Sequence, residues 1–352
     1  MTRLGGSDAR GTSDATSLVD LSEWTACGGC AAKWGAGPLD ALLETLAHRP
    51  VDDALVVGLD AFDDAAVLVL SDDLALVSTT DFFPPLVADP DDYGAIAAAN
   101  ACSDVFAMGG RVVLALNIAA FPEHLPQHAI EAIVSSAAAV VADAGGVVAG
   151  GHTIRSTELV FGLAVQGLVH PGRILTKRSA RPGQRVVLSK PLGTGIVLQG
   201  GTDDEKRTTI ARMRQLNRDA SLALQALDGA VGAVTDVTGF GLLGHCREVA
   251  DRSGVALLLD AHALPLYRGA REAAERGVRT GGDARNREHL AGCVASSATA
   301  AIEAVAFDPQ TSGGLIATVD RAVVADLAGA GFVAIGEVAA SDRLDGTRVV
   351  LR

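Results

Sequence analysis

Residues 91–119 read DDYGAIAAANACSDVFAMGGRVVLALNIA, and this stretch indicates the fold class. Asp91 and Asp92 can cap a helix, which the Ala-rich sequence continues to Met108. The Gly-Gly pair that follows is a typical helix stop, and the apolar run over 111–119 predicts a strand. A helix that leads directly into a strand predicts an α/β fold packed with small aliphatic side chains.

Helix and strand patterns alternate on both sides of this stretch. A helix opened by Pro38 precedes it, and further helices are expected over 127–144 and 205–227. Strands are expected over 65–70, 74–79, 146–149, 159–169 and 185–189, and a strand-helix-strand pattern is expected at the end of the chain. The pattern restarts after Pro171, where a basic stretch interrupts it. We therefore predict a disordered tail over 1–20, an N-terminal domain over 21–170 and a C-terminal α/β domain over 171–352.

Composition limits the class of protein. The 352 residues are 49% hydrophobic and only 4% aromatic, with 40 glycines, as expected for an α/β enzyme with well-developed cores. A net charge of −13 argues against nucleic acid as a partner. The sequence has no long apolar run, so it predicts no membrane span. The first twenty residues have no apolar segment, so they do not predict a signal peptide. Five cysteines without a regular ladder indicate reduced thiols, so we expect a cytoplasmic protein.

The segment TACGGCAAK at residues 25–33 places the thiol of Cys30 three residues before the ammonium of Lys33. A nearby cation stabilises a thiolate, and adjacent glycines let backbone N–H groups approach an anion. This pattern predicts a reactive loop near the start of the N-terminal domain, and a mobile one because of its glycines. The alternative is a surface turn with incidental thiols, and Cys27 is interpreted as incidental.

Four carboxylates and one amide form the second group of candidates. Asp64 precedes an expected strand, Asp81 ends one, Asp104 lies on the central helix and Asp236 precedes a Gly-Phe-Gly turn. Taken alone, each of these carboxylates is explained equally well by a solvated surface charge or a helix cap. Asn100 and Asp104 differ, because a spacing of four puts both on one face of a helix. Carboxylates brought together repel unless a cation joins them, so the pattern favours Mg²⁺.

Two Gly-rich pieces offer backbone donors to the phosphates of a nucleotide. One is Gly150-Gly151-His152-Thr153, expected as a turn after a strand, and the other is Gly193-Thr194-Gly195, expected to open a helix. His152 alone is as well explained as a structural histidine. Neither a Walker sequence nor a Rossmann glycine pattern is present, so neither of those nucleotide-binding folds is predicted.

Taken together, seven stretches of the chain closely resemble the selenophosphate synthetases (selenide, water dikinases). They are GCAAK at 29–33, DDAAV at 63–67, STTDFF at 78–83, NACSDVFAMGG at 100–110, GGHT at 150–153, TDVTGFG at 235–241 and DPQTSGG at 308–314. The resemblance implies two α/β domains of the aminoimidazole ribonucleotide synthetase type. It also implies a homodimer in which the N-terminal domains pair and their strands close a central β-barrel.

The implied reaction converts ATP, selenide and water to selenophosphate, AMP and orthophosphate, which supplies activated selenium for selenocysteine, selenouridine or both. The implied catalytic pair is Cys30 and Lys33, in a family whose members often carry selenocysteine at the position of Cys30. The implied Mg²⁺ ligands are Asp64, Asp104 and Asp236, with Asp81 as a fourth candidate. The implied ATP contacts are Lys33, Asp81, Asn100, Asp104, Gly150, Gly151, His152 and Thr153.

Two alternatives to this function remain open. One is another ATP-dependent enzyme of the same fold, such as aminoimidazole ribonucleotide synthetase, thiamine monophosphate kinase or the hydrogenase maturation enzyme. These give no reason for Cys30 and Lys33 in one loop. The other is a non-catalytic carrier of selenium or nucleotide. The chain also departs from the family pattern at Asp283, which leaves the role of that residue open.

Overall fold

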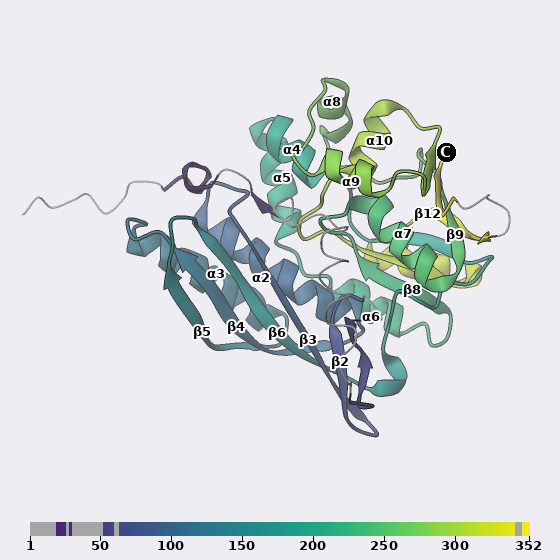
Figure 1. Ribbon diagram of the computed structural model, residues 1–352, viewed down its shortest axis with the longest axis horizontal. Helices are drawn as coiled ribbons and strands as arrows, with labels where there is room; N and C mark the ends of the chain where they lie inside the picture. Colours follow the sequence, from purple (N-terminus) through teal and green to yellow (C-terminus); the bar gives the residue numbers. More distant parts are fainter. Residues whose placement is uncertain (1–18, 26–27, 30–51, 60–62, 342–346) are drawn as a thin grey trace, which may run out of the picture.

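In the computed structural model, the described residues 19–25, 28–29, 52–59, 63–341 and 347–352 form a mixed α/β structure with two β-sheets (Figure 1). The expected α/β class is confirmed. The helix expected after Pro38 lies outside the described residues, as do residues 1–18 of the tail expected over 1–20. A short 3₁₀ helix, η1 (Leu21–Trp24), is the first element described.

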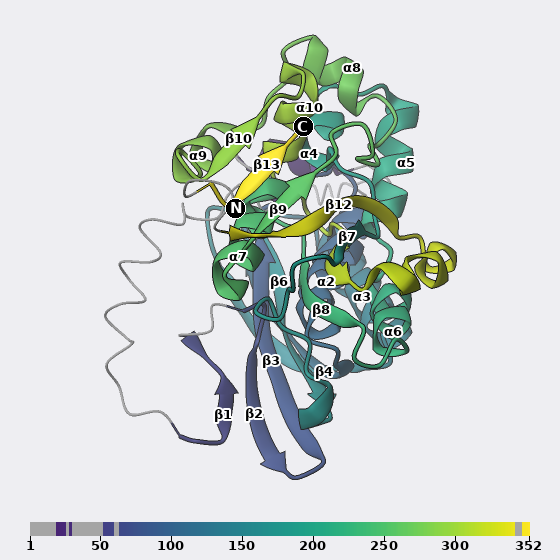
Figure 2. The same ribbon diagram turned by 90° about the vertical axis from the view of Figure 1, so that its right-hand side faces the viewer.

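The first sheet has the strand order β1-β2-β3-β6-β4-β5. Its strands are β1 (Leu55–Val57), β2 (Ala66–Ser71), β3 (Leu74–Phe83), β4 (Arg111–Phe121), β5 (Val147–Arg155) and β6 (Val160–Val169). All neighbours are antiparallel except β4 and β5, because helix α3 (Gln127–Asp143) links these two by a crossover. Helices α2 (Pro90–Ala107) and α3 cover one face (Figures 1 and 2), while Leu70, Phe82 and Ile154 are exposed.

Helix α2 begins two or three residues earlier than the sequence predicted. The side chain of Asp89 accepts a hydrogen bond from the Asp92 backbone N–H at 3.0 Å, so Asp89 is the N-cap. The prediction that Asp91 and Asp92 cap the helix is therefore wrong; they lie in its first turn, after Pro90 at the first helical position. The predicted stop is confirmed, since Gly109 has a φ of +74°, a conformation that few other residues adopt easily.

The second sheet has the strand order β10-β13-β9-β12-β7-β11-β8. Its strands are β7 (Arg185–Leu188), β8 (Val231–Asp236), β9 (Val255–Leu259), β10 (Val294–Ser296), β11 (Leu315–Val319), β12 (Val333–Ala340) and β13 (Val349–Leu351). The helices that accompany it are α4 (Thr194–Gly200), α5 (Asp203–Met213), α6 (Arg218–Gln225), α7 (Gly241–Ser253), α8 (Ala270–Glu275), α9 (Asp283–His289) and α10 (Ala300–Phe307). The 3₁₀ helices are η4 (Pro171–Arg173) and η5 (Arg321–Ala330).

The long helix expected over 205–227 is wrong, because the chain breaks between α5 and α6. Polar groups of the residues between α5 and α6 form hydrogen bonds with distant parts of the chain. The Asn217 side-chain amide donates to the hydroxyl of Ser103 at 2.8 Å and to the carbonyl oxygen of Gly313 at 2.9 Å. The Gln215 carbonyl oxygen accepts a hydrogen bond from the Lys190 ammonium at 2.6 Å. These tertiary contacts override the local helical preference.

The turn expected at Gly150–Thr153 is also wrong, since these residues continue strand β5 to Arg155. Gly150 and Gly151 have φ values of +148° and +149°, which residues with a side chain rarely adopt. A Cβ on Gly151 would lie only 2.2 Å from the carbonyl oxygen of Asn117 on the neighbouring strand β4. The glycines therefore allow a close approach between two strands.

The buried apolar side chains of the described residues form three clusters, and helix α2 contributes to two of them, one on the first sheet and one, through Ala107, on the second. The core of the first sheet is formed mainly by residues before 170, but Met213 of α5 is buried within it. The backbone of α2 also accepts a hydrogen bond from the second half, where the Ser221 hydroxyl donates to the Phe106 carbonyl oxygen at 2.6 Å. The division at residue 170 stays a prediction.

None of the helices in the described part of the chain combines the length and apolarity needed to cross a bilayer.

Candidate functional site

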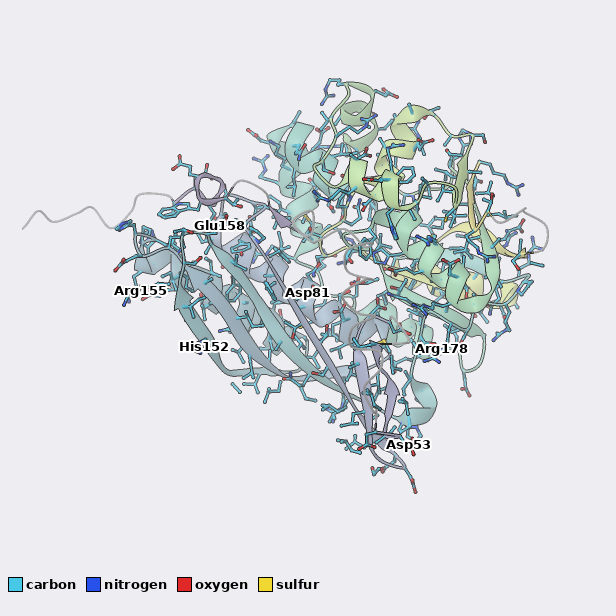
Figure 3. The ribbon with its side chains drawn as sticks, in the orientation of Figure 1. Asp53, Asp81, His152, Arg155, Glu158 and Arg178 are labelled. Atoms are coloured by element: carbon cyan, nitrogen blue, oxygen red, sulfur yellow. The ribbon has the colours of Figure 1, made fainter. Side chains whose placement is uncertain are left out.

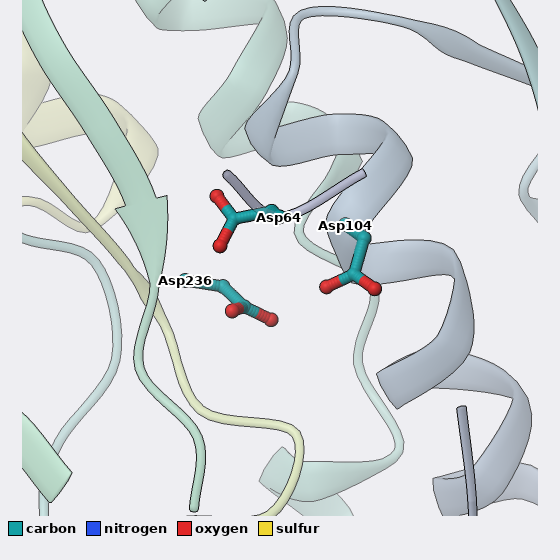
Figure 4. A group of neighbouring side chains, drawn as sticks. All are labelled: Asp64, Asp104 and Asp236. Carbon is teal, nitrogen blue, oxygen red and sulfur yellow. The ribbon is translucent and has the colours of Figure 1, made fainter. Parts of the chain in front are cut away.

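Three carboxylates from distant parts of the chain meet where the two halves face each other (Figure 4). Asp64 precedes β2, Asp104 lies on α2 and Asp236 ends β8. One oxygen atom of each lies within 4.8 Å of an oxygen of the others. Three of the four predicted carboxylates are thus brought together.

The remaining contacts of these carboxylates leave oxygens available to a ligand. The Thr79 hydroxyl donates to Asp104 Oδ2 at 2.5 Å, and the Thr235 hydroxyl donates to Asp64 Oδ1 at 2.8 Å. Among the described residues, Asp64 Oδ2 and Asp236 Oδ2 are buried without a hydrogen-bond partner. Buried carboxylate oxygens are costly without a partner, so this pattern indicates that a cation belongs here.

The electrostatics of the group point the same way. Burial, and then the charge of Asp81 followed by that of Asp236, raise the pKa of Asp104 well above its usual range. Burial, and then Asp64, raise the pKa of Asp236 from 3.8 to about 6. Both shifts mean that negative charge is disfavoured when no cation is bound. A donor set made only of carboxylate oxygens fits a hard divalent cation such as Mg²⁺.

Asp81 and Asn100 lie beside this group and are linked to the second half of the chain. The Asn100 amide donates to Asp81 Oδ2 at 2.7 Å, and Asn100 Oδ1 accepts from the backbone N–H of Ser312 at 2.7 Å. Ser312 has a φ of +52°, which is rare for a residue with a side chain and is held by tertiary contacts. Asn100 therefore joins β3 to the 308–314 segment.

A buried ammonium group contacts the acidic group, and no local sequence pattern predicted it. Lys177 is 4% exposed, and its Nζ lies 2.9 Å from both Asp64 Oδ1 and Glu248 Oε2. Glu248 Oε2 in turn lies 3.1 Å from His245 Nδ1, and His245 Nε2 accepts from the Thr238 backbone N–H at 3.1 Å. The chain of contacts runs from the turn after Asp236 back to Asp64.

Within this network, the charged forms of Lys177 and Glu248 stabilise each other. Burial opposes the charge of Lys177, but Asp64 and then Glu248 outweigh it and raise the pKa of the ammonium. Burial likewise opposes the charge of Glu248, but Lys177 and then His245 hold the pKa of that carboxylate below its usual range. No local pattern distinguishes Lys177 from the exposed Arg178 beside it, because the burial of Lys177 depends on strands and helices far along the chain.

The two Gly-rich pieces lie in different surroundings. Strand β5, with Gly150, Gly151, His152 and Thr153, is at the sheet edge, separated from β3 by β6 and β4. Figure 3 shows His152 and Asp81 at separate places on the sheet. Within one chain these four residues do not join the acidic group, and their role as nucleotide contacts stays a prediction.

The expectation that Gly193-Thr194-Gly195 holds phosphate is wrong. Gln310 Oε1 accepts hydrogen bonds from the backbone N–H groups of Gly193 at 2.9 Å and Thr194 at 3.0 Å. Asp308 Oδ2 accepts from the Ile196 N–H at 3.1 Å. The 308–314 segment thus satisfies the donors at the start of α4 itself, and burial raises the pKa of Asp308 to about 7.

The predicted catalytic pair, Cys30 and Lys33, lies outside the described residues, as does Cys27. The preceding glycines are described. The Gly29 N–H donates to the Pro84 carbonyl oxygen at 2.9 Å, and a Cβ on Gly29 would lie 2.9 Å from the Thr311 hydroxyl. Gly29 therefore contacts both the end of β3 and the 308–314 segment. Asp283 forms an ion pair with Arg287 at 2.9 Å on α9, away from this group.

The chain is similar to known protein families over both of its halves. Residues 62–169 match the family "AIR synthase related protein, N-terminal domain", and residues 181–348 match "AIR synthase related protein, C-terminal domain". A protein of Pelobacter propionicus named "Selenide, water dikinase" is 44% identical over 310 residues, covering 86% of this chain and 88% of the relative. One of the same name from Geobacter metallireducens is 43% identical, covering 86% and 89%.

The chain belongs to the selenide, water dikinase family. Its fold is shared more widely. The structure of thiamine monophosphate kinase from Aquifex aeolicus matches with a TM-score of 0.66 at 20% identity, covering 90% of this chain and 96% of that one. The hydrogenase maturation protein HypE in complex with ATP matches with a TM-score of 0.56 at 18% identity, covering 95% and 94%. The predicted two-part fold of the aminoimidazole ribonucleotide synthetase type is confirmed.

The Lys177 network leads to a first prediction. Lys177→Met removes the ammonium that pairs with the buried Asp64 side chain and with Glu248, whose side chain is 18% exposed, so the protein should lose about 3–5 kcal/mol of stability. Thermal unfolding followed by circular dichroism measures the loss. Arg178→Met is the matched control, and it should change stability by no more than about 0.5 kcal/mol. Equal melting temperatures for both variants would contradict a structural role for the network, and Glu248→Gln should partly rescue Lys177→Met.

Asp236 leads to a prediction about pH. Because its folded pKa of about 6 is above the usual 3.8, the folded protein without metal binds this proton more tightly than the unfolded chain does. The resulting stabilisation is present below the unfolded pKa and is lost as pH rises through about 6. The metal-free Asp236→Asn variant should therefore gain melting temperature relative to the parent as pH rises from about 5 to about 7.

Added Mg²⁺ is the control for this measurement. It should raise the melting temperature of the parent more than that of the variant, because the variant lacks one proposed ligand. A difference between the two proteins that stays constant with pH would show that Asp236 does not carry this charge.

Proposed function

We propose that this chain is a selenide, water dikinase that converts ATP, selenide and water to selenophosphate, AMP and orthophosphate. The observation that carries the proposal is the 44% identity to a protein of that name over 86% of the chain. The solved structures of thiamine monophosphate kinase and HypE are only 18–20% identical, so they support the fold alone. The chain also has the Cys30 and Lys33 loop, for which those enzymes give no reason.

Asp64, Asp104 and Asp236 would hold Mg²⁺, and Asp81 is a weaker candidate because Asn100 already binds its Oδ2. Bound Mg²⁺ would neutralise phosphate charge, which is the main requirement of phosphoryl transfer. Lys177 fixes Asp64 through Oδ1 and leaves Oδ2 free for the cation. The protein thereby orients a ligand before the metal arrives.

ATP is the proposed nucleotide, and Asn100 and Lys33 are proposed to contact it together with Gly150–Thr153. Strand β5 is three strands from β3, about 14 Å away, so Gly150–Thr153 lie apart from Asp81 within one chain. The exposed apolar side chains of the open face, including Phe82 and Ile154, support a homodimer in which a second copy covers this face. A partner subunit could then bring its β5 to the acidic group.

Cys30 and Lys33 are proposed as the catalytic pair. The ammonium of Lys33 would stabilise charge on the γ-phosphate, and the thiolate of Cys30 would handle selenium or shape the site for hydroselenide. The contacts of Gly29 with Pro84 and near Thr311 support this, because they anchor the start of the loop next to elements that bind Asn100. A reactive thiolate needs a reducing compartment, so we propose that the enzyme works in the cytoplasm.

The function is tested by measuring AMP, ADP and selenophosphate under oxygen-free, reducing conditions. The protein with Mg²⁺ and ATP should release AMP only when selenide is added, with selenophosphate visible by ³¹P NMR. Thiamine monophosphate in place of selenide is the control for the rival kinase. ADP formed with thiamine monophosphate, together with no AMP formed with selenide, would overturn the proposal in favour of that kinase. Nucleotide binding without turnover of either would favour a carrier.

The catalytic loop gives a further prediction in the same assay. Cys30→Ser should lose most selenide-dependent AMP release while still binding Mg²⁺-ATP, because serine is not ionised near neutral pH. Lys33→Ala should lower the rate about a hundred- to thousand-fold. Cys27→Ser is the matched control and should behave like the parent. Equal, near-parental rates for both serine variants would reduce the segment to a turn, and equal losses would point to a cysteine pair.

A further inference from the structure

A cavity of about 630 Å³ lies on the described surface between the two halves of the chain. Its walls come from the end of α3, the segment after β7, the link between α5 and α6, and residues 329–331 before β12. None of the carboxylates of the acidic group lines it. The proposed reaction assigns it no role.

Four cationic side chains line this cavity, namely Lys190, Arg212, Arg214 and Arg218, together with two acidic ones, Asp143 and Asp219. Two of the cations are already neutralised. Arg214 forms ion pairs with Asp91 and Asp92 at 2.9 and 2.5 Å, and Arg218 pairs with Asp219 at 3.2 Å. The ion pairs formed within the described residues include none for Lys190 or Arg212, and the hydrogen bonds of their side chains go to uncharged oxygens.

The charge of Lys190 is the more costly of the two to bury. It is 3% exposed, and its Nζ donates to the carbonyl oxygens of Gln215 at 2.6 Å and Ser312 at 3.0 Å. A buried ammonium has three protons and a full charge, and two carbonyl groups do not neutralise it. Burial, and then the charge of Arg212, lower the pKa of Lys190 to about 7, and the charge of Asp236 offsets them only in part.

Arg212 adds a second positive charge at the same place. Its Nη2 donates to the Ser189 carbonyl oxygen at 3.2 Å, and its Nη1 donates to the side-chain oxygen of Gln215. Gln215 thus contacts both cations, the ammonium through its backbone and the guanidinium through its side chain. Lys190, which is buried, and Arg212 are two positive charges whose hydrogen-bond partners are uncharged. An anion that contacts both side chains would stabilise them.

We propose that this cavity binds a small phosphate-bearing ligand, with the phosphate group recognised by Lys190 and Arg212. An ammonium and a planar guanidinium together match the several acceptor oxygens of a phosphate. The volume exceeds what a single ion needs, so the ligand class includes both free orthophosphate and a phosphate monoester. None of the three acidic-group carboxylates lines the cavity, although the charge of Asp236 acts on Lys190, and the proposal does not depend on the reaction proposed above.

Isothermal titration calorimetry with orthophosphate, and separately with AMP, tests the proposal on the full-length protein. Each titration is run without nucleotide and again with Mg²⁺ and a non-hydrolysable ATP analogue. The parent should bind orthophosphate, AMP or both, and binding should persist with the analogue present. Tighter binding of AMP than of orthophosphate would identify a monoester, and the reverse would identify the free ion.

Arg212→Gln should weaken this binding about tenfold or more, because it removes a charge-assisted contact. Arg207→Gln is the matched control, since Arg207 lies on the same helix, pairs with the exposed Asp204 and does not line the cavity. Lys190→Met should have the larger effect, with thermal unfolding used to check that it folds. Equal affinities in the parent, Arg212→Gln and Arg207→Gln would overturn the proposal. So would binding abolished by the analogue, or no binding by the parent at millimolar ligand.

Discussion

Helix α2 is buried on every side, and the rest of the structure depends on this constraint. Every residue from Tyr93 to Ala107 is buried, so each polar group on the helix needs a partner inside the protein. Small residues make this packing close, since a Cβ on Gly94 would lie 2.1 Å from a carbonyl oxygen of α3. The polar side chains of Asn100 and Ser103 find partners in β3 and in the second half of the chain. Interior hydrogen bonds therefore hold the two sheets together.

The acidic group follows from the same constraint. Asp104 is carried by α2 into the junction, where Asp64 and Asp236 meet it from the two sheets. Carboxylates at this separation oppose one another, and Lys177 offsets only part of their charge because it contacts Asp64 alone among the three. The remaining charge is what makes a cation favourable here. Without a cation, the group therefore carries a repulsion that a bound cation would relieve.

Local sequence patterns predicted the parts of the structure that depend on neighbouring residues. Helical spacing placed Asn100 and Asp104 on one face, and the structure has both directed to the same junction. The break between α5 and α6 escaped prediction because it depends on the contacts of Asn217 with residues about a hundred positions away. Lys177 escaped for the same reason, and the Gly150–Thr153 stretch was misassigned because glycines occur in turns far more often than inside strands.

The sharing of α2 between two cores has a consequence for how the chain is made on the ribosome. The first sheet and its helices are complete in the sequence by residue 170, yet Met213, Ser221 and Ser312 supply parts of the packing around α2. At roughly 5–20 residues per second, these partners leave the ribosome several seconds to tens of seconds after α2 does. During that interval the nascent first half exposes an apolar, partly unsatisfied surface. The packing around α2 is therefore complete only after the second half has been synthesised.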